Sequence, residues 1–175
     1  LLDWEKAFDK VTRKGLFKSI ERMGVPEKIQ KAIKSLYKNQ KFKVEIDGKE
    51  SEWWEQGTGI RQGCPLSPYL FVLAMGVLMS DVKERLTTPK QKEPIPGIHF
   101  SEVLYADDTL LILRTKEALE TLLHEIEREA EYYGLRLNLG KCELLDLDGK
   151  QETKFRSGAH MKNCLLYPSP SPRDG

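Results

Sequence analysis

Hydrophobic residues recur at intervals of three and four in several parts of the chain, which is the spacing of one buried helix face. The pattern predicts helices over residues 16–23, 26–37, 66–79 and 119–133. Gly24 and Gly134 stand where the first and the last of these should end, and Pro26 stands where the second should begin. Residues 66–79 are mostly apolar, so this helix is expected to be buried.

Alternation of apolar and polar residues predicts strands elsewhere. Apolar residues alternate with charged ones over 42–47, and Asp47-Gly48 then leads into residues 51–56, which is typical of a β-hairpin. Residues 103–106 and 109–113 predict a second hairpin with Asp107-Asp108 at its tip. Further strands are expected at the first residues and over 135–138 and 143–147. The order of elements predicts an α+β fold with an antiparallel sheet backed by helices.

The length of 175 residues predicts one compact domain, which we place at residues 1–148. Residues 87–97 contain three prolines among charges and are expected to form a surface connection. Residues 149–175 lack periodicity and contain Ser-Pro-Ser-Pro, so they are expected to be a disordered or foreign tail. A strand without a visible beginning and the absence of an initiator Met suggest a fragment of a longer protein.

Composition narrows the class of protein. The chain is 39% hydrophobic and 31% charged with a mean hydropathy of -0.50, values typical of a soluble globular protein. No apolar run reaches the roughly 18 residues of a spanning helix, and no secretion signal is visible. Cys64, Cys142 and Cys164 are odd in number and widely spaced, so we expect free thiols and no structural zinc.

Charge is distributed unevenly along the chain. Residues 1–50 carry 13 Lys and Arg against 8 Asp and Glu, whereas residues 101–150 carry 6 against 12. A basic first part could bind a polyanion while an acidic later part supplies carboxylates. Charge on solvated helix faces is the commoner cause of such a gradient, so it favours nucleic acid only slightly.

The strongest chemical signal is Tyr105-Ala106-Asp107-Asp108 between two apolar runs. Adjacent carboxylates repel, so a cation or solvent has to offset their charge. Asp3 follows an apolar strand start, and an acid there beside the hairpin tip could complete a site for two divalent ions. Oxygen ligands without His or Cys indicate Mg²⁺ or Mn²⁺. The alternatives are an ordinary Asp-Asp turn and, for Asp3, a helix cap.

A third segment, residues 57–68, is rich in glycine and proline. Its glycines allow close approach of backbone, Arg61 offers a partner for phosphate, and Gln62 can hydrogen-bond a base or a sugar. Taken alone, the same residues could be a loop before a helix that starts at Ser-Pro.

Four segments in order carry a resemblance to a known family: residues 2–9 (Leu-Asp-Trp-Glu-Lys-Ala-Phe-Asp), 59–68 (Gly-Ile-Arg-Gln-Gly-Cys-Pro-Leu-Ser-Pro), 105–108 (Tyr-Ala-Asp-Asp), and 134–141 with Gly134, Asn138 and Lys141. Together they resemble the palm of reverse transcriptases, most closely those of non-LTR (LINE-type) retrotransposons. The match extends from residue 1 to about 147. It implies the palm of a right-hand polymerase, with fingers and thumb largely missing from this chain.

The resemblance implies an RNA-directed DNA polymerase that transfers dNMP to a primer 3′-hydroxyl with two Mg²⁺ ions, Mn²⁺ being a possible substitute. The implied catalytic and metal-binding residues are Asp3, Asp107 and Asp108. The implied nucleotide-binding residues are Phe8 as a steric gate against ribonucleotides, Arg61, Gln62, Gly63, and Lys141 at the pyrophosphate, with Tyr105 next to the primer terminus. A core role for Phe8 and a merely solvated role for Lys141 stay open.

The implied partners are an RNA template, a DNA primer and dNTP, inside the cell in cytoplasm and nucleus as a ribonucleoprotein. The family also leads us to expect basic fingers before Asp3, a helical thumb, and endonuclease and zinc-knuckle regions, which this sequence lacks. Two alternatives remain at this point. One is a catalytically inactive retrotransposon remnant with at most weak nucleic-acid binding, and the other is a group II intron maturase-type reverse transcriptase.

Overall fold

The computed structural model describes residues 1–86, 102–146 and 152–164. The helices are α1 (Ala7–Lys10), α2 (Arg13–Arg22), α3 (Glu27–Leu36), α4 (Ser67–Arg85) and α5 (Lys116–Tyr133). The strands are β1 (Lys41–Phe42), β2 (Glu45–Ile46), β3 (Lys49–Glu50), β4 (Trp54–Glu55), β5 (Glu102–Tyr105), β6 (Asp108–Leu111), β7 (Glu143–Leu144) and β8 (Lys162–Asn163). Every helix that the hydrophobic spacing predicts is present, and the α+β class is confirmed.

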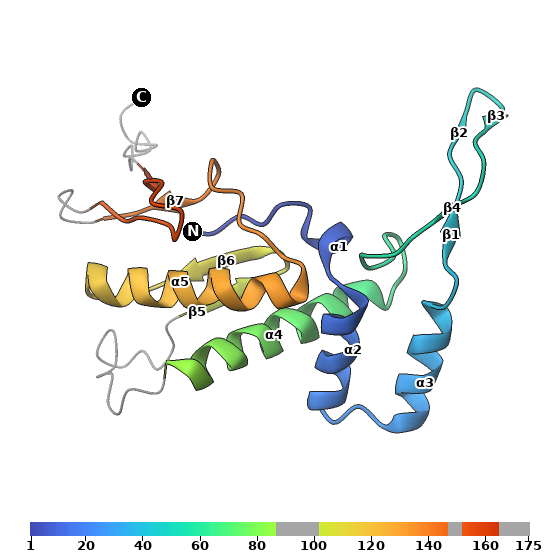
Figure 1. Ribbon diagram of the computed structural model, residues 1–175, viewed down its shortest axis with the longest axis horizontal. Coiled ribbons are helices and arrows are strands. Elements are labelled where there is room, and N and C mark those ends of the chain that lie inside the picture. The colour runs from blue at the N-terminus through green and yellow to red at the C-terminus, as the bar shows by residue number, and fades with distance from the viewer. Residues whose placement is uncertain (87–101, 147–151, 165–175) are drawn as a thin grey trace, which may run out of the picture.

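Helices α2, α4 and α5 pack together around the main core (Figure 1). Each contributes side chains that are less than 2% exposed, among them Leu16, Ile20, Phe71, Leu78, Leu123 and Ile126. Helix α4 continues six residues beyond its predicted end at 79. Its last turns hold the buried Asp81, which accepts a hydrogen bond from the Tyr133 hydroxyl at 2.8 Å and pairs with Arg22. These partners on α5 and α2 let a charged residue lie inside the core.

Local signals in the sequence set the helix ends. The Thr12 and Thr115 hydroxyls accept hydrogen bonds from backbone N–H groups in the first turns of α2 and α5, as N-cap residues do. Gly134 ends α5 with φ 76°, and a Cβ there would lie 2.6 Å from the Lys10 carbonyl oxygen. Glycine is therefore required at this point both for the turn and for the close approach of the two segments.

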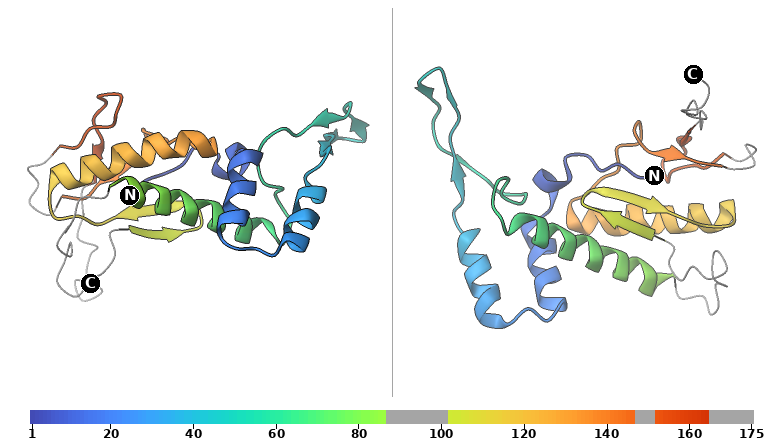
Figure 2. Two further views of the ribbon diagram at one scale, coloured as in Figure 1. Left: turned by 60° about the horizontal axis from the view of Figure 1, so that its bottom comes forward. Right: turned by 180° about the vertical axis from the view of Figure 1, so that it is seen from behind.

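The strands form small two-stranded sheets in the described ranges, three antiparallel and one parallel. The β1–β4 and β2–β3 pairs make one long hairpin with Asp47-Gly48 at its turn, and it extends away from the helices (Figure 1). The β5–β6 hairpin lies against α5 and α4, as Figure 2 shows from behind. Both predicted hairpins are confirmed, but the parallel β7–β8 pair replaces part of the expected antiparallel sheet.

Residues 152–164 fold back onto α5, which corrects the expectation of a disordered tail for this part of 149–175. Phe155 is 1% exposed, and the backbone N–H of Arg156 donates to the Glu127 carboxylate at 2.9 Å. The apolar residues of this segment are scattered without periodicity, so the sequence does not predict that they are buried. Their burial becomes apparent only when the segment is seen folded back onto α5, which is distant in sequence. The predicted connection at 87–97 and the rest of the tail, 165–175, lie outside the described residues.

Candidate functional site

The first residues of the chain lie alongside β6. The Leu2 N–H donates to the Thr109 carbonyl at 2.7 Å, and the Thr109 N–H donates back at 3.3 Å. Leu2 and Thr109 are both buried, at 2% and 0% exposed. Because side chains alternate along extended chain, their neighbours Asp3 and Asp108 lie together on the opposite, more exposed face.

Backbone and side-chain hydrogen bonds hold the Asp3 segment on both edges. The Trp4 indole Nε1 donates to the Thr109 hydroxyl at 3.0 Å on the buried face. On the other edge, the Asn138 N–H donates to the Asp3 carbonyl at 2.9 Å, and Trp4 pairs with Leu137. The backbone of Asp3 is therefore fixed between β6 and the segment after α5.

The acidic hairpin tip presents its side chains to solvent. Tyr105 pairs with Asp108 across the hairpin and is 80% exposed. Ala106 has φ 52°, a left-handed conformation that side-chain-bearing residues seldom adopt, and Asp107 follows it in the turn. The strained turn separates the adjacent acids, with Asp107 in the turn and Asp108 at the start of β6.

The three carboxylates share this part of the surface without forming a closed site. In the described residues, no hydrogen bond or ion pair to the Asp3, Asp107 or Asp108 side chain is recorded. Like charges on neighbouring strands are destabilising unless a cation compensates them. Their oxygen-only donor set suits Mg²⁺. However, the described ranges contain no group of three or more His, Cys, Asp or Glu side chains assembled closely enough to hold a metal ion.

Lys141 lies in a turn whose neighbours contact Asp3. Its N–H donates to the Asn138 carbonyl at 2.9 Å, and its own side chain is exposed. The Cys142 sulfur lies 3.4 Å from the Asp3 N–H, which donates to it. Burial raises the pKa of the Cys142 thiol, so a neutral group lies beneath Asp3. The structure thus brings Lys141 into the neighbourhood of Asp3.

A second group of residues forms where the glycine-rich loop packs on α1. The Ile60 N–H donates to the Phe8 carbonyl at 2.6 Å, and the Gln62 side chain donates to the Asp9 carboxylate at 2.8 Å. Gly59 has φ 84°, and a Cβ on it would lie 2.8 Å from the Asp9 carbonyl oxygen. The loop can approach α1 this closely only with glycine there.

Phe8 packs against the core of α4. Its ring stacks on Phe71 with centroids 4.4 Å apart and an angle of 20° between the planes. Phe8 is half-buried, so the ring is fixed in position while part of it faces solvent. Arg61 and Gly63 are exposed in the neighbouring loop. Only four residues separate Asp3 from Phe8. The chain therefore leads directly from the carboxylate of Asp3 to α1, on which the glycine-rich loop packs.

Several residues that organise this site were not identified from sequence. Thr109, Trp4, Cys142 and Asp9 all position candidate residues through contacts with distant segments. Thr109 and Trp4 read as ordinary strand residues, and no local pattern marks their pairing.

Comparison with known proteins identifies the family. The family described as reverse transcriptase (RNA-dependent DNA polymerase) matches residues 1–157. The chain belongs to this family, and the sequence prediction of a LINE-type reverse transcriptase is confirmed. The match ends nine residues beyond the domain boundary placed at 148, within the segment that folds onto α5.

The relatives are proteins of mobile elements. The chain is 32% identical to a Pol polyprotein from the retrotransposable element R2 of Nasonia vitripennis, over 91% of this chain and 15% of the relative. It is 31% identical to the transposon TX1 149 kDa protein of Xenopus laevis, over 88% and 12%. It is 29% identical to the RNA-directed DNA polymerase from mobile element jockey of Drosophila melanogaster, over 81% and 15%. The chain thus spans less than a sixth of these proteins. Within the described ranges, no helix is both long and apolar enough to cross a membrane.

Proposed function

We propose that this chain is the palm of an RNA-directed DNA polymerase, and that Asp3, Asp107 and Asp108 hold the divalent ions for transfer of dNMP to a primer 3′-hydroxyl. The observation that supports the proposal is the pairing of buried Leu2 with buried Thr109, since side-chain alternation then directs Asp3 and Asp108 to the opposite, more exposed face. Membership of the reverse transcriptase family supplies the reaction class.

When bound, Mg²⁺ or Mn²⁺ would lower the pKa of the primer hydroxyl and neutralise the triphosphate. The protein's own contribution is placement and charge. Asp3 sits on a backbone hydrogen-bonded on both sides, so its carboxylate is held relative to the hairpin. Tyr105, exposed opposite Asp108, would pack beside the primer terminus, and Lys141 would neutralise the departing pyrophosphate.

The glycine-rich loop and the adjoining Phe8 would select and orient the nucleotide. Gln62 is held by Asp9, and Arg61 and Gly63 lie beside it, so this loop would contact the dNTP and the template strand. Phe8 would exclude a ribose 2′-hydroxyl, because stacking on Phe71 prevents its ring from moving aside. The template, primer and dNTP remain proposed partners, and copying RNA with dNTP would take place inside the cell.

Primer extension on an RNA template with dNTPs and Mg²⁺ tests the proposal, using this chain and its Asp107→Asn variant. We expect the variant to lose extension by at least about 100-fold, since removing a catalytic charge forfeits several kcal/mol of transition-state stabilisation. Asp47→Asn is the matched control, because Asp47 is also an exposed acid at a hairpin turn and lies on the projecting hairpin.

Extension that survives in Asp107→Asn would contradict the assignment of the site. Folded wild-type chain that extends no primer would contradict the proposal that this chain polymerises by itself, and it would leave membership of the reverse transcriptase family intact. A further variant, Phe8→Val, is expected to accept ribonucleotides more readily while keeping extension with dNTP. Unchanged discrimination in Phe8→Val would assign Phe8 to the core alone.

A further inference from the structure

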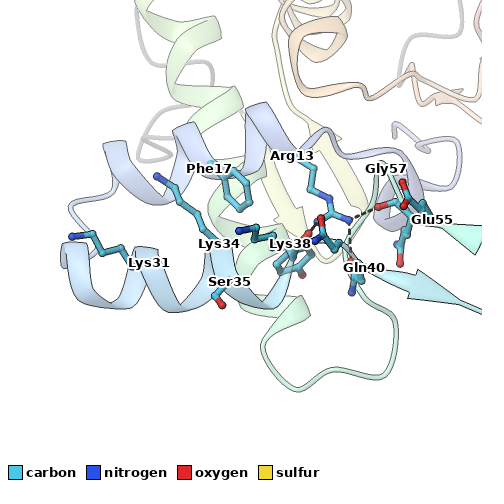
Figure 3. Close-up of a pocket in the computed structure, with 12 residues that line it drawn as sticks. Arg13, Phe17, Lys31, Lys34, Ser35, Lys38, Gln40, Glu55 and Gly57 are labelled. Atoms are coloured by element: carbon cyan, nitrogen blue, oxygen red, sulfur yellow. Dashed lines mark hydrogen bonds between the residues drawn. The ribbon is translucent and has the colours of Figure 1, made fainter.

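A groove of about 650 Å³ lies between α2, α3 and the base of the projecting hairpin (Figure 3). Phe17 of α2 and Tyr37 at the end of α3 line it, with their rings edge to face and centroids 6.4 Å apart. Four uncharged polar residues also line it: Ser35, Asn39, Gln40 and Gln56. The candidate acidic and loop residues of the proposed polymerase site do not line this groove.

Positive charge predominates along the groove. The basic residues that line it are Arg13, Lys31, Lys34 and Lys38. One carboxylate, that of Glu55, also lines it and has Lys41 at 3.9 Å. Within the described ranges, only Lys31 of the four basic residues has a recorded ion pair, to Glu27 at 2.8 Å on the exposed helix surface. An exposed pair of this kind contributes little stability and exchanges readily with another anion.

Arg13 is a fixed cation at one end of the groove. Its guanidinium donates to the Tyr37 carbonyl, to the Gln40 side-chain oxygen at 2.9 Å and to the Gln56 carbonyl at 2.5 Å. All three acceptors are uncharged, so the positive charge of Arg13 is oriented but not neutralised. Burial lowers its pKa, yet arginine remains protonated at neutral pH. Its Nε atom is buried without a hydrogen-bond partner.

The lysines extend this charge in a row. Lys31, Lys34 and Lys38 recur at intervals of three and four, so they lie on one face of α3 and its end. At 1.5 Å per residue the row is about 10 Å long. The groove is concave and combines neutral hydrogen-bonding groups with this row of lysines, of which only Lys31 has an ion pair in the described ranges. Such a surface suits a chain of phosphates better than a single carboxylate.

We propose that this groove binds the phosphodiester backbone of a single nucleic-acid strand without reading its sequence. The identification of the polyanion rests on the proposed polymerase function. Gln56 and Gly57 of the groove lead directly into the loop that holds Gln62 against Asp9. A strand bound in the groove would therefore continue toward the loop where the template is proposed to lie, and the groove would hold it away from the reacting atoms.

Fluorescence anisotropy with a labelled single-stranded oligouridine, in EDTA and over a series of salt concentrations, tests the groove. The variant is Lys31→Gln, Lys34→Gln and Lys38→Gln in one chain. Lys14→Gln, Lys116→Gln and Lys162→Gln in one chain is the control with equal charge, since these lysines lie outside the groove. Loss of three phosphate contacts is expected to reduce the slope of log K against log salt by about 2, and to weaken low-salt binding at least about 10-fold.

Equal slopes in the groove variant and the control would overturn the proposal, as would a wild-type chain that binds no oligouridine at the lowest salt. Polyglutamate that competes as well as unlabelled RNA of equal charge would assign the groove to an acidic peptide instead. Circular dichroism of each variant checks that it is folded. Asp107→Asn separates the two proposals, because it is expected to abolish extension and leave binding in EDTA unchanged.

Discussion

The indole Nε1 of Trp4 donates a hydrogen bond to the hydroxyl of Thr109 at 3.0 Å, across 105 residues of sequence and inside the core. This bond joins the residue after Asp3 to the residue after Asp108. The two acids at the centre of the proposed site are therefore positioned by neighbours that are buried and uncharged. The buried face holds the register, and the exposed face is left available for chemistry.

Removing the Trp4–Thr109 hydrogen bond is expected to destabilise the fold. Thr109→Val keeps the shape of the side chain but leaves the buried indole N–H unpaired, which should cost about 1–3 kcal/mol. Urea unfolding of Trp4→Phe, Thr109→Val and the double variant measures the coupling, expected at about 1 kcal/mol. Strictly additive effects would show that the bond contributes no coupling energy.

Substitution of Gly59 is expected to displace the glycine-rich loop, residues 57–68. Gly59→Ala would place a Cβ 2.8 Å from the Asp9 carbonyl oxygen in a left-handed conformation, so we expect a loss of about 2 kcal/mol or more. Gly57→Ala is the matched control, because a Cβ there meets nothing within 4 Å. Its effect should stay within about 0.5 kcal/mol in the same urea unfolding experiment. Similar losses in both variants would show that the close approach to α1 is unimportant.

Stability is expected to fall at alkaline pH because of Tyr133. Burial raises the pKa of this phenol above its ordinary value of 10.0, and its protonated hydroxyl donates to Asp81. A group with a raised folded-state pKa contributes stability that is present below the unfolded pKa and is lost as pH rises through the folded pKa. The free energy of unfolding should therefore fall more steeply above about pH 10 in the wild type than in Tyr133→Phe. If the free energy of unfolding fell equally with pH in the wild type and in Tyr133→Phe, the alkaline loss of stability would not originate from Tyr133.

Divalent ions are expected to stabilise the folded chain. Asp3, Asp107 and Asp108 have no recorded partner in the described ranges, so an ion that binds them adds its binding energy to folding. At about ten times the dissociation constant, Mg²⁺ should raise the free energy of unfolding by about 1.4 kcal/mol. Thermal unfolding measures this effect, with EDTA as the reference.

The Asp3→Asn variant should lose most of this Mg²⁺ effect, whereas Asp47→Asn should keep it. Equal stabilisation of all three chains would mean that Mg²⁺ binds elsewhere. This thermal unfolding measurement is independent of the primer-extension assay, because stabilisation by Mg²⁺ requires no nucleic acid and no turnover.

Local signals were sufficient for most elements of the fold. The ends of α2 and α5 follow from Gly24, Gly134 and the spacing of their apolar residues. The two hairpins follow from Asp47-Gly48 and from the apolar runs around Asp107-Asp108. Prediction failed where a residue depends on a distant surface. Phe155 is one such residue, buried in a segment whose neighbours Lys154 and Arg156 donate backbone hydrogen bonds to Glu120 and Glu127 of α5.

The sequence by itself determined the family, the acidic hairpin and the identity of the candidate residues, because these depend on residue type, order and short-range spacing. Only the tertiary structure decided that Asp3 lies beside β6, that Gln62 is held by Asp9, and that Arg13 and the lysines of α3 border one groove. Such relationships arise from hydrogen bonds and packing between segments far apart in the chain. No local pattern specifies them, since many pairings of strands satisfy the same alternation.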